Sequence, residues 1–171
     1  MKKLVFTTLL LSLLSCKSSN FGIIENKIKM VGNCPEDGTC NLVLFKNKKL
    51  KILTDDLGSL YFSLADNNDT HVFHYQYQRN VPEEVQDGHH IEEVYWEINT
   101  EVINLTIENE ALQQTKMIFG RHCYCKGQAG FFKVSSGSLQ IIKATSGYEV
   151  RSHFNIKEVP QIIDTITGIV Q

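Results

Sequence analysis

The sequence has little proline, no excess of either charge, and no long hydrophobic run beyond its first residues. It contains 3 prolines and 11 glycines among 171 residues, which excludes a linker protein rich in both. Lysine and arginine number 17 against 19 acidic residues, and the net charge of -2 excludes a strongly basic nucleic-acid-binding protein and a long acidic tail. Hydrophobic residues make up 42% of the chain, which is typical of one folded globular domain.

The N-terminal segment is predicted to be a secretory signal peptide. Lys2 and Lys3 precede the apolar stretch Leu4–Leu14, and the small residue Ser15 stands before Cys16. A positive start, a short apolar run and a small residue are typical of a signal peptide. The run is shorter than the ~20 residues that a permanent transmembrane helix needs. An ordinary signal peptide that happens to precede a cysteine, or a short anchor, is the alternative interpretation.

The motif Leu13-Leu14-Ser15-Cys16 resembles the lipobox of bacterial lipoproteins. The resemblance implies that residues 1–15 are removed and that Cys16 is lipidated, for example with palmitate. Several acyl chains would give stable membrane attachment, because each buried methylene contributes ~0.8 kcal/mol. Residues 16–20 would be the lipidated cysteine and its tether, and residues 21–171 a single domain. Residue 17 is not Asp and no acidic run follows; in similar lipoproteins this favours the periplasmic face of the outer membrane, with surface exposure as the alternative.

Beyond the tether, apolar and polar residues alternate through much of the chain. Clear runs of this kind are 60–64, 73–77, 94–98, 103–107 and 148–156. Polar turn segments separate the runs, among them 46–49, 55–58 and 135–138. About ten short strands are predicted, including Ile23–Val31 and a less regular one at Leu112–Phe119. Because strand–helix–strand order is missing, the expected fold is a mainly β antiparallel sandwich or barrel.

The C-terminal segment has a different pattern. Apolar residues recur there at helical spacing: Val159, Ile162, Ile163, Ile166 and Val170. Pro160 suits a first helical turn, so an amphipathic helix packed on a sheet face is predicted for 159–170. Gly168 and the β-branched residues favour a terminal strand as the alternative.

One internal segment carries a second resemblance. Leu50–Tyr77, with the turn Asp55-Asp56-Leu57-Gly58 before an alternating strand, resembles a transthyretin-type or carboxypeptidase-regulatory β-sandwich. The resemblance implies the same class of fold as the alternating pattern.

Four cysteines besides Cys16 are candidate disulfide residues: Cys34, Cys40, Cys123 and Cys125. An even number of cysteines in an oxidising compartment indicates disulfides first. The first pair can close locally over an Asp-Gly turn, whereas the second needs a tight ring, so local pairs and cross-linked pairs both stay open.

The same cysteines support an alternative function. His122, Cys123 and Cys125 form a soft-ligand cluster that suits Cu(I) or Zn(II), with Cys34 and Cys40 as additional ligands. A Cys-x-Cys bridge can also act as a reducible redox switch. Structural disulfides are the favoured interpretation because of the compartment.

Two other segments contain chemically active side chains. In Asn80–Glu93 the carboxylates and histidines are Glu83, Glu84, Asp87, His89, His90, Glu92 and Glu93. The segment is interpreted as a solvated acidic loop in preference to a divalent-metal site. Gly120–Gly130 carries Arg121 and Lys126, which suit an anion, although a disulfide-linked corner is favoured. The aromatic stripe Phe73, Tyr75 and Tyr77 is assigned to the core.

No catalytic motif such as Gly-x-Ser-x-Gly is present. The favoured function is therefore that of a non-enzymatic cell-envelope lipoprotein whose β-domain binds an unknown protein or small ligand, without cofactor or nucleic acid. Metal handling is the alternative, and hydrolysis of cell-wall glycan ranks third because no carboxylate pair is identifiable.

Replacing the lipobox cysteine tests the predicted anchor. Expressed in a Gram-negative host, the wild-type protein should incorporate labelled fatty acid and fractionate with membranes. Cys16→Ser should abolish both, because the thiol is the site of acylation. A soluble, unlabelled wild-type protein would contradict the lipoprotein prediction.

Overall fold

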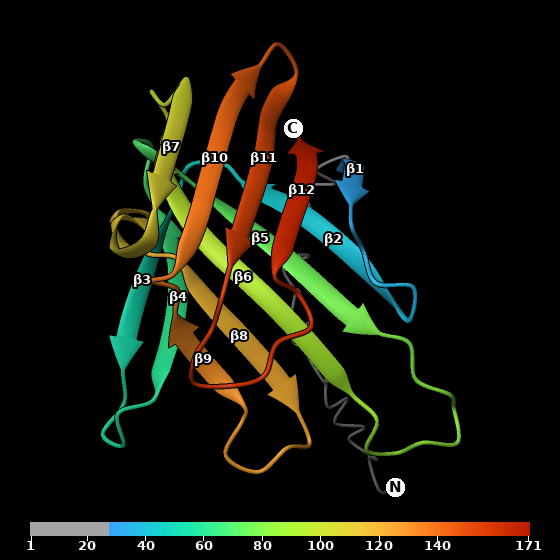
Figure 1. Cartoon of the computed structure of the whole chain (residues 1–171). Coiled ribbons are helices and arrows are strands. Elements are labelled where there is room, and N and C mark those ends of the chain that lie inside the picture. The colour runs from blue at the N-terminus through green and yellow to red at the C-terminus, as the bar shows by residue number, and fades with distance from the viewer. Residues whose placement is uncertain (1–27) are drawn as a thin grey trace, which may run out of the picture.

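The computed structural model of the chain describes residues 28–171, with side chains described from Val31 on. The signal peptide, Cys16 and the tether lie outside the described residues. Within 28–171 the chain forms 12 strands in two antiparallel sheets and one short 3-10 helix (Figure 1). The predicted mainly β sandwich is confirmed, and the two sheets stay open rather than closing into a barrel. In this part of the chain, the single helix is too short to cross a membrane.

Five strands make up the first sheet. In spatial order they are β1 (Ile28–Gly32), β12 (Thr165–Val170), β11 (Gly147–Phe154), β10 (Gly137–Ala144) and β7 (Asn104–Glu108). The second sheet has seven strands, in the order β2 (Gly38–Phe45), β5 (Thr70–Arg79), β6 (His90–Asn99), β8 (Ile118–Cys123), β9 (Gly130–Lys133), β4 (Leu60–Asp66) and β3 (Lys48–Thr54).

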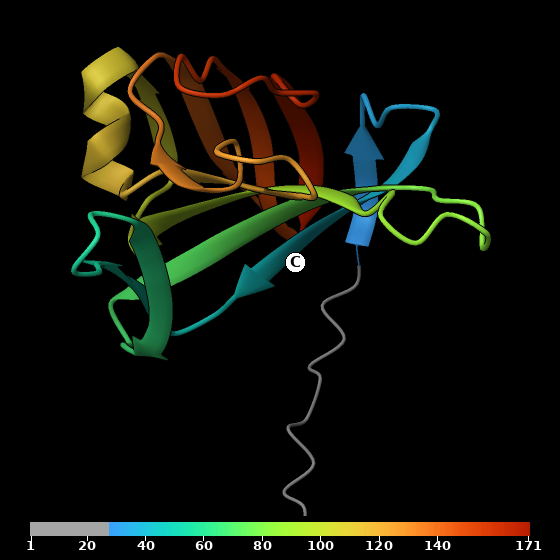
Figure 2. The ribbon, with the colours of Figure 1, turned by 90° about the horizontal axis from the view of Figure 1, so that it is seen from below.

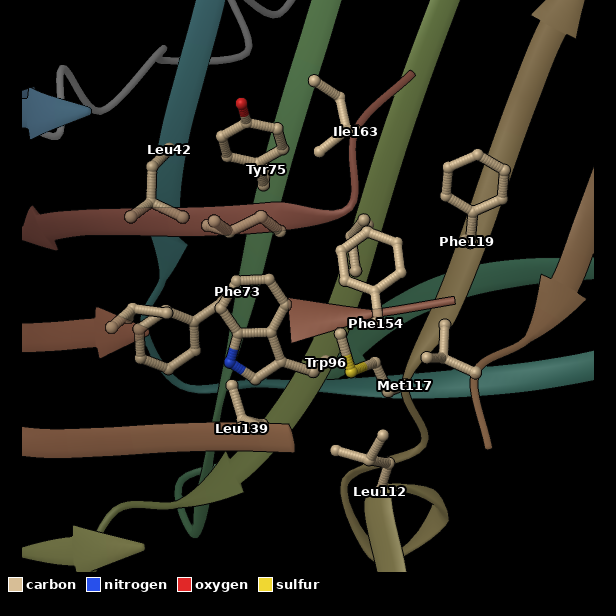
Figure 3. Close-up of a cluster of buried hydrophobic side chains, with 14 of the residues drawn as sticks. Leu42, Phe73, Tyr75, Trp96, Leu112, Met117, Phe119, Leu139, Phe154 and Ile163 are labelled. Atoms are coloured by element: carbon tan, nitrogen blue, oxygen red, sulfur yellow. The ribbon is translucent and has the colours of Figure 1, made fainter. Parts of the chain in front are cut away.

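The main core lies between the two sheets and is rich in aromatic side chains (Figure 3). Phe73 stacks on Trp96 of the neighbouring strand, with ring centroids 5.2 Å apart, and Tyr148 of the facing sheet meets Phe73 edge-on at 5.5 Å. Tyr75 and Tyr77 follow Phe73 on the same face of β5 and are fully buried. The aromatic stripe therefore belongs to the core, as predicted.

The β3–β4 hairpin covers the other face of the seven-stranded sheet. Figure 2 shows this hairpin on the side opposite to the five-stranded sheet. A second, smaller core fills the space beneath it, built on Leu50, Val72, Tyr95 and Ile118. Glu97 of β6 accepts the backbone N–H of Leu50 at 2.5 Å. Lys116 donates from Nζ both to the Leu50 carbonyl at 3.0 Å and to Glu97 at 2.8 Å, so β3 is fastened across the sheet.

Two sequence-based assignments were wrong. The predicted helix at 159–170 is instead an irregular segment followed by β12, which pairs with β1 and β11. The alternative prediction of a terminal strand is confirmed from Thr165 on, and Ile166 and Val170 are both buried in that strand. The β-branched content of the segment favours a strand over a helix. The predicted strand at Leu112–Phe119 begins as a 3-10 helix, Asn109–Thr115, and β8 starts only at Ile118.

A matched pair of leucine substitutions tests the core. Leu42 is fully buried between the sheets, whereas Leu57 is 91% exposed in the β3–β4 turn. Leu42→Ala should lower the free energy of unfolding by about 2–5 kcal/mol, because it removes buried methylenes and leaves a cavity. Leu57→Ala should change it by less than about 0.5 kcal/mol. Urea denaturation measures both, and equal losses would contradict the placement of Leu42.

Candidate functional site

Two consecutive carboxylates of β6, Glu92 and Glu93, are buried on opposite faces of the seven-stranded sheet. Successive side chains of a strand point to opposite faces, so Glu92 lies between the two sheets and Glu93 lies on the face that the β3–β4 hairpin covers. Only 1% of Glu92 and 8% of Glu93 is exposed. A buried carboxylate is costly unless it is paired or hydrogen-bonded, and each of these two has its own partners.

Glu93 is the centre of a cluster to which three neighbouring strands contribute. His74 on β5 lies with Nε2 2.9 Å from one carboxylate oxygen, and His122 on β8 lies with Nε2 2.8 Å from the other. The Tyr95 hydroxyl donates to the carboxylate at 3.0 Å. The His74 ring also stacks on the Tyr95 ring, with centroids 4.2 Å apart and planes within 3° of parallel. The cluster ties β5, β6 and β8 together.

The electrostatics of this cluster keep Glu93 ionised. Burial alone would raise the pKa of Glu93, but the hydrogen bonds and charges of His122 and His74 outweigh burial and lower it from 4.5 to about 2. Burial, reinforced by the Glu93 charge, raises the pKa of Tyr95 well above its usual range. Solvent reaches the cluster through His122, whose side chain is 41% exposed against 15% for His74. The cluster is therefore an ionised, largely buried carboxylate that approaches solvent only on the side of His122.

Glu92 has a structural role on the inner face. Its carboxylate accepts the backbone N–H groups of Ile162 and Ile163 at 2.8 Å, and Nε2 of His90 lies 3.0 Å away. This fastens the segment between β11 and β12 across one end of the sandwich. Nε of Arg121 is 3.8 Å from Glu92, and the guanidinium also donates to the turn after β8. Arg121 is thus engaged within the fold rather than free to meet an anion.

The four candidate cysteines form two local disulfides, Cys34–Cys40 and Cys123–Cys125, with Cα–Cα distances of 5.7 and 5.2 Å. The disulfide prediction is confirmed, and the cross-linked connectivity is not formed because β5 and β6 stand between β2 and β8. The proposed ligand set of His122, Cys123 and Cys125 does not come together: the thiols are paired, and His122 points to Glu93 on the outer face.

The acidic loop is shorter than predicted, because His90–Glu93 belongs to β6 and only 80–89 is irregular. Glu83, Glu84 and Asp87 are exposed there. Within residues 28–171, no group of three or more histidine, cysteine or acidic side chains could hold a metal ion.

A hollow of about 510 Å³ opens at the end of the sandwich that carries the β10–β11 turn. We call it the basic mouth and define it by Lys46, His71, Lys143 and Tyr148, which line it with the polar segment Thr145–Gly147. No Asp or Glu is among its described lining residues. Lys143 lies with Nζ 6.0 Å from the Tyr148 ring centre, and the His71 ring meets the same ring edge-on at 6.1 Å.

The mouth arises from the alternation of three strands. Each strand directs apolar residues into the core at every second position and carries a basic residue one step beyond, at the rim. The three series are Leu42, Leu44 and Lys46 on β2 and just after it, Leu139, Ile141 and Lys143 on β10, and Phe73 preceded by His71 on β5. Three cationic or ionisable side chains from separate strands thus face one opening.

The charge of the mouth is not neutralised within the described chain. Neither Lys46 nor Lys143 is in an ion pair there. Burial lowers the pKa of His71, and repulsion from Lys46 and Lys143 lowers it further. Nδ1 of His71 lies 3.1 Å from the backbone N of Asn47 and 3.1 Å from the carbonyl oxygen of Thr70, so this ring nitrogen has a donor and an acceptor beside it. An anion in the mouth would relieve the repulsion among these groups.

Comparisons with known proteins add no relative: no family model, no curated protein and no solved structure matches the chain. The class that the fold defines is a mainly β protein of two antiparallel sheets.

The pH dependence of stability tests the Glu93 cluster. Because the pKa of Glu93 is about 2 in the folded protein and near 4.5 in the unfolded chain, its ionisation stabilises the fold fully above about pH 5. This contribution, about 3 kcal/mol, is lost as the pH falls towards 2. The difference in unfolding free energy between wild type and Glu93→Gln should therefore be larger at about pH 5 than at pH 2 and shrink on acidification between them. Glu84→Gln, at an exposed loop position, is the control, and a difference independent of pH would contradict the assignment.

Proposed function

We propose that the protein is a cell-envelope lipoprotein, anchored through Cys16 at the periplasmic face of the outer membrane, whose β-domain is a non-enzymatic binding module. We further propose that the module takes an anionic ligand at the basic mouth. The observation that supports this most directly is the convergence of Lys46, His71 and Lys143 from three strands on one hollow.

The charges in the mouth favour a ligand over a purely structural role. Structural lysines and arginines of this chain have acidic partners: Lys116 contacts Glu97, and Arg79 contacts Asp37. Lys46 and Lys143 have no such partner within the described residues, which is also true of exposed lysines such as Lys51 and Lys133, and they differ from those in lining one hollow together with His71. Placing like charges around one hollow raises the free energy of the empty site, and a bound anion would lower it.

The surroundings of the charges indicate the size and chemistry of the ligand. A hollow of about 510 Å³ accommodates a small molecule or the end of a chain rather than a folded partner. The buried residues Tyr148 and Leu44 line it, together with the hydroxyl-bearing residues Thr145 and Ser146. A phosphate or carboxylate group carried by a partly apolar molecule suits this combination, because the ammonium groups bind the anion and the ring packs on the rest.

The lipoprotein part of the proposal is supported by the lipobox-like motif, and disulfides fit an oxidising compartment. The likeness of 50–77 to a transthyretin-type sandwich is likewise compatible with a binding domain, and it stays a proposal.

A charge-neutralising double variant tests the mouth. Phosphate, pyrophosphate and citrate, titrated at low ionic strength, should shift the NMR resonances of His71 and Tyr148 and raise the pKa of His71. Lys46→Gln/Lys143→Gln should weaken binding at least about tenfold, since each lost charge-assisted contact is worth about 1.5–3 kcal/mol. Lys51→Gln/Lys133→Gln removes the same charge at exposed positions away from the mouth and should leave binding unchanged. Equal binding by the two double variants would refute the proposal.

A further inference from the structure

The Cys123–Cys125 disulfide lies apart from the basic mouth and has a different chemistry. We propose that it is a redox-active site that exchanges two electrons with a dithiol of another protein. The proposal does not depend on the ligand of the mouth. It rests on the different surroundings of this disulfide and of Cys34–Cys40 in the same chain.

The Cys34–Cys40 disulfide is built into the fold. Both cysteines pack against the main core. Asp37, inside the ring, accepts the Tyr77 hydroxyl at 2.8 Å, and its carbonyl accepts the backbone N–H of Asn80 at 2.8 Å. Opening this disulfide would loosen a segment that several contacts hold against β5.

The Cys123–Cys125 disulfide belongs to neither core cluster. It stands where β8 ends and a turn begins, and the residue between the cysteines, Tyr124, is 85% exposed. Residues 126–129 are exposed as well, so an attacking thiolate can approach from solvent. Lys126 follows Cys125 directly, and a neighbouring cation favours a thiolate over a thiol. Access and thiolate character are the two properties that govern thiol–disulfide exchange.

The fold around this disulfide has contacts that do not need it. Cys123 is paired in register with His90 across β6 and β8. The Gln128 backbone N–H donates to the Cys125 carbonyl at 3.1 Å, and the Gln128 side chain accepts from Arg121 at 2.9 Å. These bonds hold the turn in either redox state, so reduction can be a local event that leaves both sheets intact.

The exchange balances without a further cofactor. A thiolate of the partner attacks Sγ of Cys125, a mixed disulfide forms, and the electron pair of the broken bond leaves on Sγ of Cys123. The partner's second thiolate then attacks the partner's first sulfur in the mixed disulfide and releases Cys125 as a thiolate. The partner is oxidised from two thiols to one disulfide, Cys123 and Cys125 are reduced to two thiols, and the two protons of the partner thiols pass to them.

The test is a native-state redox titration of the whole mature protein in glutathione buffers of rising reduced-to-oxidised ratio, with acid quenching, alkylation and mass mapping of each cysteine. Cys123 and Cys125 should be alkylated at a ratio at least about tenfold lower than Cys34 and Cys40, and oxidised glutathione should reverse this. Thermal unfolding should stay cooperative after the selective reduction.

Two double variants and a dithiol peptide complete the test. Cys34→Ser/Cys40→Ser should still oxidise one equivalent of a reduced dithiol peptide per chain, as wild type does. Cys123→Ser/Cys125→Ser should oxidise none of it under native conditions. If the Cys123–Cys125 disulfide resists reduction until the protein unfolds, or if peptide oxidation persists in Cys123→Ser/Cys125→Ser, the proposal is overturned. A Cys34→Ser/Cys40→Ser variant that fails to fold leaves the wild-type titration as the deciding measurement.

Discussion

The burial of β6 on both faces is the constraint from which most of the architecture follows. One face packs against the five-stranded sheet through Val94 and Trp96, and the β3–β4 hairpin covers the other at Tyr95. Because both faces of β6 are buried, any charged side chain on this strand needs hydrogen-bond or ion-pair partners within the protein. Glu92 and Glu93 are consecutive on this strand, and their side chains therefore point to opposite faces of the sheet. Each carboxylate needs its own set of hydrogen-bond partners.

Each set of donors organises a different part of the molecule. The backbone donors to Glu92 fix the irregular segment before β12, which closes one end of the sandwich. The partners of Glu93 are His74 and His122 from β5 and β8, the two neighbours of β6, and the Tyr95 hydroxyl from β6 itself, so the cluster joins the three strands. The opposite end of the sandwich carries the basic mouth. There the alternating strands simply continue past the core, and their next inward residues are basic.

Strand alternation is a local property, and the regions where it holds could be predicted from the sequence. Phe73, Tyr75 and Tyr77 were assigned to the core because their spacing alone indicates one face. The strand β12 was only the alternative prediction, because Val159, Ile162 and Ile163 mimic a helical stripe, whereas tertiary pairing with β1 and β11 decides the conformation. Both cysteine pairs close locally because β2 and β8 are not neighbours in the sheet. The spacing of cysteines in the sequence does not reveal this strand order.

The candidate sites were harder to predict, since each is assembled from strands distant in sequence. His122 was recognised, but His74 and Tyr95, which share the Glu93 carboxylate with it, precede it by 48 and 27 residues and were counted only as strand residues. The basic mouth had one usable signal: Lys46 and Lys143 both follow two apolar residues at alternate positions. Without the strand order, nothing indicates that these two lysines face each other.

The edge strand β3 has a consequence for how copies of this protein meet one another. It is the terminal strand of its sheet, and one side of its backbone is open for pairing. Lys48, Lys49 and Lys51 crowd its seven residues, and a second β3 laid alongside would bring like charges into register. Edge lysines oppose such strand-to-strand addition. On the membrane surface that we propose for this protein, where copies would be crowded, these side chains would keep neighbouring sandwiches from joining into a continuous sheet.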